Sequence, residues 1–125
     1  MQILLIDDNK DITTMLSKYF IQKGHSCTVS NSGSNGLNMI TASQYDAVLL
    51  DLAMPEFSGT DIVEELFKSG KIAKLNIVAL TASSVDTEKD KHLKKMGVRA
   101  VLKKPIDPDE LLDFLSQFNH KTVTM

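Results

Sequence analysis

Five short runs rich in Val, Ile and Leu alternate with helical patterns along this chain of 125 residues, and the alternation strongly constrains the fold. Each run has the length and composition of a buried strand. We predict strands at about residues 2–6, 25–30, 47–50, 76–80 and 99–102. Strands that alternate with helices form a parallel sheet with right-handed crossovers and helices on both of its faces.

Local signals mark the ends of the intervening helices. The first carries apolar residues at helical spacing from Ile12 to Phe20 and ends at Gly24. The third begins near Ser58, where Asp61 three residues later forms a short-armed variant of a capping box. The second, fourth and fifth are predicted at about residues 33–42, at 86–95 and from 107 onward. The fourth is almost entirely charged, so we expect it to pack through little apolar area.

Chain length then selects a strand order. Of the two common doubly wound orders, 2-1-3-4-5 suits five strands in a chain of this length. The predicted class is therefore α/β, with a flavodoxin-like doubly wound (βα)5 fold and a five-stranded parallel sheet. We predict one domain over residues 1–119 and a short, frayed tail over residues 120–125.

Polar side chains gather where the predicted strands end. Asp7 and Asp8 follow the first strand, Asp51 follows the third, Thr81 the fourth and Lys104 the fifth. In an open α/β sheet, ligands bind in the crevice outside the carboxyl ends of the strands. The predicted order makes the first and third strands neighbours, which brings the three carboxylates together. The sequence therefore predicts a ligand site at this edge.

The residue types indicate phosphoryl chemistry that depends on a metal. Three crowded carboxylates repel one another unless a cation or a proton compensates. Mg²⁺ fits because it binds one or two protein carboxylates and leaves positions for water and a phosphate oxygen. The ammonium of Lys104 and the hydroxyl of Thr81 could hold a phosphoryl group. Asp51, at the end of the central strand, is the candidate nucleophile and would become an aspartyl phosphate.

Several of these residues also have a structural interpretation. The acidic pair, with Asn9, could simply cap the first helix. Lys103 competes with Lys104 for the role of the ammonium, although strand alternation points the two side chains to opposite faces. Pro105 could only end the strand, or it could form a cis bond that aims Lys104.

The whole chain resembles the receiver domains of two-component response regulators, in particular the chemotaxis-regulator type. The motifs are Asp7-Asp8, Leu49-Leu50-Asp51-Leu52-Ala53-Met54-Pro55-Glu56-Phe57-Ser58-Gly59, Thr81-Ala82 and Lys104-Pro105. The resemblance implies that a sensor histidine kinase or a histidine phosphotransfer protein donates a phosphoryl group to Asp51. A downstream protein target would then read a conformational change in the face formed by the fourth and fifth strands and helices. The alternative role in this family is that of a phosphotransfer shuttle in a multistep relay.

The resemblance also assigns a cofactor. Asp8, Asp51 and the backbone carbonyl of Ala53 would bind Mg²⁺ directly, while Asp7 would act through water. Such a domain is not an enzyme in the usual sense, because it catalyses only its own phosphorylation and dephosphorylation.

The resemblance places Thr81 and Lys104 on the phosphoryl oxygens and implies a cis bond between Lys104 and Pro105. One position departs from the family pattern. Receivers of this type usually carry an aromatic residue three positions before the lysine, and here that residue is Val101. Valine has no ring to swing inward with Thr81, so we expect the fourth helix to shift or become ordered instead. Ala53 and Ser83, two positions beyond Asp51 and Thr81, are small and leave the phosphoryl group open to water. The resemblance implies that residues at these positions tune the lifetime of the phosphorylated state.

Composition excludes several partners. With 14 basic and 16 acidic residues the net charge is −2, so no basic field points to direct binding of nucleic acid. No apolar run is long enough for a signal peptide or a membrane span. The single cysteine, Cys27, cannot form an internal disulfide and is better explained as a small core residue than as a nucleophile. We therefore expect a cytoplasmic protein.

Two other protein classes fit the site less well. A flavin-binding flavodoxin-like protein needs a Ser/Thr/Gly loop after the first strand, where Asp7 and Asp8 would repel the flavin phosphate. A metal-dependent phosphohydrolase would usually add a general acid two residues after its nucleophile, and this chain has Ala53 there.

Overall fold

The computed structural model describes residues 1–82 and 87–123, and its five parallel strands form one sheet in the order β2-β1-β3-β4-β5. The strands are β1 (Gln2–Ile6), β2 (Ser26–Ser30), β3 (Ala47–Asp51), β4 (Ile77–Thr81) and β5 (Ala100–Lys103). Every neighbouring pair is parallel. The predicted fold class and strand order are therefore confirmed.

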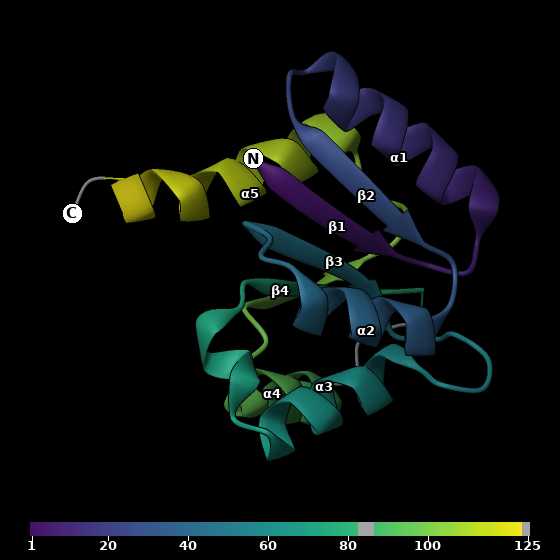
Figure 1. The fold of residues 1–125 in the computed structure, drawn as a ribbon, viewed down its shortest axis with the longest axis vertical. Helices are drawn as coiled ribbons and strands as arrows, with labels where there is room; N and C mark the ends of the chain where they lie inside the picture. Colours follow the sequence, from purple (N-terminus) through teal and green to yellow (C-terminus); the bar gives the residue numbers. More distant parts are fainter. Residues whose placement is uncertain (83–86, 124–125) are drawn as a thin grey trace.

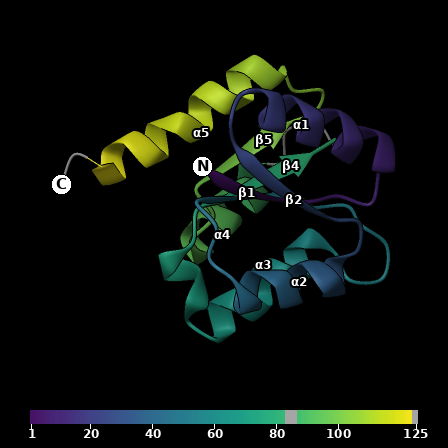
Figure 2. The same cartoon turned by 45° about the horizontal axis from the view of Figure 1, so that its top comes forward.

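Helices cover both faces of the sheet, with α1 and α5 on one side and α2, α3 and α4 on the other (Figures 1 and 2). The helices are α1 (Lys10–Gln22), α2 (Gly33–Ala42), α3 (Gly59–Lys68), the 3-10 turn η1 (Lys71–Lys74), α4 (Thr87–Met96) and α5 (Pro108–Val123). Helix α5 continues past residue 119, and the division into a domain and a tail stays a prediction. Ser83 and the predicted helix start at residue 86 lie outside the described residues. Among residues 1–82 and 87–123, no helix has the length and apolar character needed to cross a bilayer.

The core consists of two clusters, one on each face of the sheet. Leu16 and Phe20 of α1 meet Leu111 and Leu115 of α5 on one face, and Cys27 packs against this cluster while remaining partly exposed. The other face buries side chains of α2, α3 and α4. Helix α4 contributes two buried apolar residues, Leu93 and Met96, as its charged sequence predicts.

Three of the strands that carry the predicted site, β3, β4 and β5, end one residue later than the sequence pattern predicts, while β1 ends at Ile6 as predicted. Asp51 and Thr81 are the last residues of β3 and β4, and Asp51 pairs in register with Leu80. Backbone hydrogen bonds between strands continue one residue beyond β3 and β5, because the amide of Leu52 donates to the carbonyl of Leu80 and the amide of Lys104 donates to the carbonyl of Thr81. Asp51 and Thr81 therefore belong to the sheet itself, whereas Asp7 and Asp8 directly follow β1 and Lys104 directly follows β5.

The start of α3 packs against the end of β3. The predicted capping box is present, since the Ser58 hydroxyl accepts from the amide of Asp61 and the Asp61 carboxylate accepts from the amide of Ser58. The next residue, Gly59, lies so close that a Cβ there would be 2.2 Å from the carbonyl oxygen of Asp51. Only a residue without a side chain fits at this contact, which fixes the loop between Asp51 and α3.

Candidate functional site

Three carboxylates from two adjacent strand ends lie together. Asp7 and Asp8 follow β1, Asp51 ends β3, and one carboxylate oxygen from each lies within 4.8 Å of the other two. Asp7 and Asp51 are buried, whereas Asp8 is exposed. The carboxylate of Asp46, five residues before Asp51, accepts a hydrogen bond from the amide of Gln2 at the start of β1. It therefore belongs to the opposite end of the sheet.

Lys104 supplies the positive charge of the cluster. Its Nζ lies 2.8 Å from Asp7 Oδ2 and 3.6 Å from Asp51 Oδ1. The peptide bond between Lys104 and Pro105 is cis. Lys103, the competing lysine, is the exposed last residue of β5 and makes no described ion pair with these carboxylates.

The ionisation of Asp51 reflects opposing influences. Burial raises the pKa of its carboxyl group, and the nearby charge of Asp7 adds to this. The backbone amide of Ala53 donates a hydrogen bond to Asp51 Oδ1 at 3.2 Å, and this bond and Lys104 both oppose the rise. For Lys104, burial alone would lower the pKa of the ammonium, but the bond to Asp7 and the charge of Asp51 raise it. The ammonium is therefore held charged beside the two buried carboxylates.

The N-terminus of α1 is capped by Asn9 and not by the acidic pair. The side-chain oxygen of Asn9 accepts from the amides of Asp11 and Ile12. The carboxylate of Asp7 accepts from the amide of Asn9 at 2.9 Å. Among the described residues, the Asp8 carboxylate makes no hydrogen bond or ion pair. Helix capping therefore does not account for Asp8, and its oxygens remain available to a ligand.

The remaining predicted residues surround this cluster. Thr81 ends β4 one position beyond the level of Asp51, and Ala53 lies next to the Asp51 carboxylate through its amide. Val101 pairs in register with Ala79 on β4 and packs, partly buried, against the cluster formed with α2, α3 and α4. Val101 thus lies in the layer between β5 and these helices rather than beside the carboxylates.

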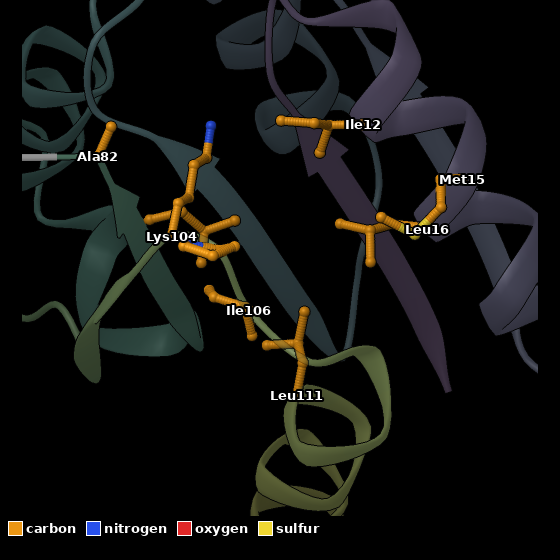
Figure 3. Close-up of a pocket in the computed structure, with 9 residues that line it drawn as sticks. Ile12, Met15, Leu16, Ala82, Lys104, Ile106 and Leu111 are labelled. Atoms are coloured by element: carbon orange, nitrogen blue, oxygen red, sulfur yellow. The ribbon is translucent and has the colours of Figure 1, made fainter.

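An apolar cavity borders the site beneath Lys104 (Figure 3). Its volume is about 400 Å³, and side chains of α1 and of the β5–α5 connection form most of its wall. Lys104 lines the cavity, and its ammonium points away from Ile106 and Leu111. The lysine therefore separates apolar walls from the carboxylate cluster.

The oxygen atoms of the cluster match the preference of a hard divalent cation. Carboxylates that converge within 4.8 Å supply the charge and the oxygen ligands that Mg²⁺ takes. In the described part of the chain, Lys104 pairs with Asp7 and Asp51 while Asp8 has no ion pair, so the three carboxylates keep an excess of negative charge that a cation would compensate.

Comparison with known proteins identifies the family. The model of the response regulator receiver domain matches residues 3–116. The chain belongs to this family. Receiver domains are generally non-enzymatic modules of two-component signalling, and they interact with histidine kinases.

Relatives of the chain are response regulators from several organisms. The regulatory protein DltR of Streptococcus agalactiae is 32% identical over 112 residues, which are 90% of this chain and 49% of that protein. The response regulator SaeR of Staphylococcus aureus is 32% identical over 111 residues, 88% of this chain and 46% of that protein. This chain thus spans about half the length of the curated relatives it matches.

Solved receiver structures share the whole fold. A receiver domain of a Francisella response regulator has a TM-score of 0.86 at 27% identity, covering 97% of this chain and 98% of that one. The response regulator TrrA of Thermotoga maritima, solved in complex with Mg²⁺ and beryllium fluoride, has a TM-score of 0.77 at 26% identity. That match covers 94% of this chain and 97% of TrrA.

Sequence reasoning missed one residue that contacts the site. The side-chain amide of Asn31, in the β2–α2 loop, donates to the carbonyl oxygen of Asp7 at 2.7 Å and to Thr13 Oγ1 at 3.1 Å. Asn31 is 24 residues from Asp7 and belongs to no motif. Only the three-dimensional path of the loop reveals the contact.

Proposed function

We propose that this receiver domain is phosphorylated on Asp51 and passes a signal to a protein target in a two-component phosphorelay. The observation that carries the proposal is the convergence of Asp7, Asp8 and Asp51 within 4.8 Å beside Lys104. The phosphoryl donor would be a sensor histidine kinase or a histidine phosphotransfer protein. Because Ala53 stands two residues after Asp51, where a metal-dependent phosphohydrolase would usually carry a general acid, the chain would promote only its own phosphorylation and dephosphorylation.

In the proposed reaction, a carboxylate oxygen of Asp51 attacks the phosphorus atom of a phosphohistidine. A new P–O bond forms while the P–N bond breaks, and the imidazole nitrogen of the donor leaves with the electron pair. The ammonium of Lys104, 3.6 Å from Asp51 Oδ1, would stabilise the charge on the phosphoryl oxygens. The Thr81 hydroxyl would donate a hydrogen bond to one of them once the aspartyl phosphate has formed.

Mg²⁺ is the proposed cofactor. Asp8, Asp51 and the carbonyl of Ala53 would bind it directly, and Asp7 would act through water. The ion would neutralise charge shared between the carboxylates and the incoming phosphoryl group. Asp8 suits direct binding because its carboxylate is exposed and makes no other described contact, whereas Asp7 is held by Lys104.

Phosphorylation with acetyl phosphate and Mg²⁺ tests the acceptor. Mass spectrometry should show the addition of one phosphoryl group, and hydroxylamine should remove it as expected for an acyl phosphate. The variant Asp51→Asn should remain unmodified. Asp46→Asn, on the same strand but at the opposite end of the sheet, is the matched control and should be labelled like the wild type. Full labelling of Asp51→Asn would contradict the proposal.

A role as a phosphotransfer shuttle is the alternative within this family. A shuttle would return its phosphoryl group to a histidine phosphotransfer protein on a time scale faster than spontaneous hydrolysis. Incubating the phosphorylated domain with such a protein, in the presence and absence of a candidate target, distinguishes the two roles.

A further inference from the structure

We infer that Asn31 is a positioning residue that orients Asp8 for the metal, an inference that rests on the proposed Mg²⁺ site. The evidence is the hydrogen bond of 2.7 Å from the Asn31 side-chain amide to the carbonyl oxygen of Asp7. That carbonyl belongs to the peptide group that joins Asp7 to Asp8. Fixing its plane fixes the direction in which the Asp8 backbone continues.

Asp7 itself is held at each of its other polar groups. Its amide donates to the carbonyl of Ser30 at 3.1 Å. One carboxylate oxygen accepts from the amide of Asn9, and the other pairs with Lys104. The bond from Asn31 completes this set, so Asp7 has little freedom to rotate.

Asp8 has no comparable support from its own side chain. Within the described part of the chain, its carboxylate makes no hydrogen bond or ion pair, and it is exposed. Its orientation therefore depends on the backbone between Asp7 and Asn9. Of the contacts to that backbone, the one from Asn31 is a side-chain contact, so a substitution can remove it without altering a metal ligand or Lys104.

The chemistry of the contact fixes which end of the Asn31 amide faces Asp7. A carbonyl oxygen only accepts hydrogen bonds, so the nitrogen of the Asn31 side chain must face it. The same nitrogen donates to Thr13 Oγ1, and the Thr13 hydroxyl donates onward to the carbonyl of Lys10. Asn31 thus joins the end of β1 to the first turn of α1, the two elements that flank Asp8.

Isothermal titration calorimetry of the protein with Mg²⁺ as the only ligand tests the inference. Asn31→Leu keeps the approximate shape of the side chain and removes the donor. Groups that support metal ligands typically contribute 10–100-fold in affinity, so we expect the Kd for Mg²⁺ to rise by about tenfold. The amide of Asp8 belongs to the same peptide group, so its nitrogen chemical shift should change in the metal-free variant.

Thr13→Val is the matched control because it removes the second partner of Asn31 and leaves the bond to Asp7. It should lower the stability to urea yet bind Mg²⁺ within about twofold of the wild type. Asn31→Ala is a second variant in case the leucine side chain prevents folding, and the same rise in Kd is expected.

Either of two results would overturn the role of Asn31 while leaving the proposed Mg²⁺ site intact. The first is that folded Asn31→Leu and Asn31→Ala bind Mg²⁺ like the wild type. The second is that Thr13→Val weakens binding as much as they do, because the effect would then pass through α1 and not through the Asp7 carbonyl. Failure of the wild type to bind Mg²⁺ would instead overturn the proposed metal site, and with it the role of Asn31.

Discussion

Gly59 provides a direct test of how tightly α3 fixes the end of β3. In Gly59→Ala the new Cβ would lie 2.2 Å from the carbonyl oxygen of Asp51 and 2.9 Å from both its carbonyl carbon and Leu52 Cα. These are backbone atoms, which cannot rotate away as a side chain can. Relief to an ordinary contact of about 3.4 Å needs a displacement of about 1 Å by the strand end or by the helix.

The structure resists both displacements. The strand end is held by the hydrogen bond from the Leu52 amide to Leu80, and the helix start by the capping box of Ser58 and Asp61. Overpacking typically costs about 1–3 kcal/mol, and loss of a cap adds about 1 kcal/mol. The better helix propensity of alanine returns at most about 1 kcal/mol. With the full propensity gain subtracted, we therefore expect Gly59→Ala to lower the free energy of unfolding by about 1–3 kcal/mol.

Urea unfolding followed by circular dichroism measures this loss as a lower midpoint with an unchanged slope. Because the displaced carbonyl belongs to Asp51, labelling by acetyl phosphate should also slow. Gly70→Ala is the control, since Gly70 has φ of 74° and a Cβ added there would meet no atom within 4 Å. Gly70→Ala should lower the free energy of unfolding by about 1–2 kcal/mol, because alanine disfavours this left-handed backbone conformation, and labelling by acetyl phosphate should not change. A Gly59→Ala variant as stable and as readily labelled as the wild type would refute this account of the contact.

Four further changes test other parts of the structure. Asp8→Asn should weaken Mg²⁺ binding more than Asp7→Asn does, and equal Mg²⁺ affinity for Asp8→Asn and the wild type would exclude Asp8 as a ligand. In the presence of a chelator Asp8→Asn should raise the melting temperature, because it relieves the repulsion between the carboxylates. Lys104→Met should lower the free energy of unfolding by about 3 kcal/mol, because it leaves the buried Asp7 carboxylate unpaired, and Asp7→Asn in that background should recover part of the loss in urea unfolding. Burial raises the pKa of the Cys27 thiol to about 11, so its alkylation by iodoacetamide at pH 8 should be roughly 100-fold slower than that of free cysteine. The alkylation rate should increase with pH, and a rate at pH 8 equal to that of free cysteine would contradict this. Val101→Tyr should change the binding of the partner but not the rate of phosphorylation. In the wild type, beryllium fluoride should alter amide hydrogen exchange in α4, and exchange changes confined to α1 or α5 would count against α4 as the responding element.

The sequence predicts the fold and the position of the carboxylate cluster well, because both depend on regular features. Apolar runs of strand length alternating with helices restrict the topology, and polar residues at strand ends must meet at one edge of a parallel sheet. The expected capping box of Ser58 and Asp61 is likewise a local pattern with a fixed spacing, and the structure contains it.

Features that depend on side-chain geometry or loop paths escape this reasoning. Lys104 lies closer to Asp7 than to Asp51, and the strand-end pattern alone does not predict which of the two carboxylates pairs more closely with the lysine. The contact from Asn31 joins residues 24 apart through a loop whose path no periodicity determines. The turn η1 was also missed, because a single 3-10 turn is too short to carry a periodic signal.

The pairing of Lys104 with Asp7 explains how one lysine could serve a site of three carboxylates. Asp7 is fully buried, so its charge needs a close partner, and Lys104 at 2.8 Å provides one. The same contact fixes the ammonium 3.6 Å from Asp51, where a phosphoryl group would form. Since the long lysine side chain is already ordered, engaging the phosphoryl oxygens would cost little further conformational entropy. On this argument Asp7 would contribute to the proposed phosphorylation mainly by holding Lys104 in place, so charge on Asp7 would matter even without direct contact to the proposed Mg²⁺.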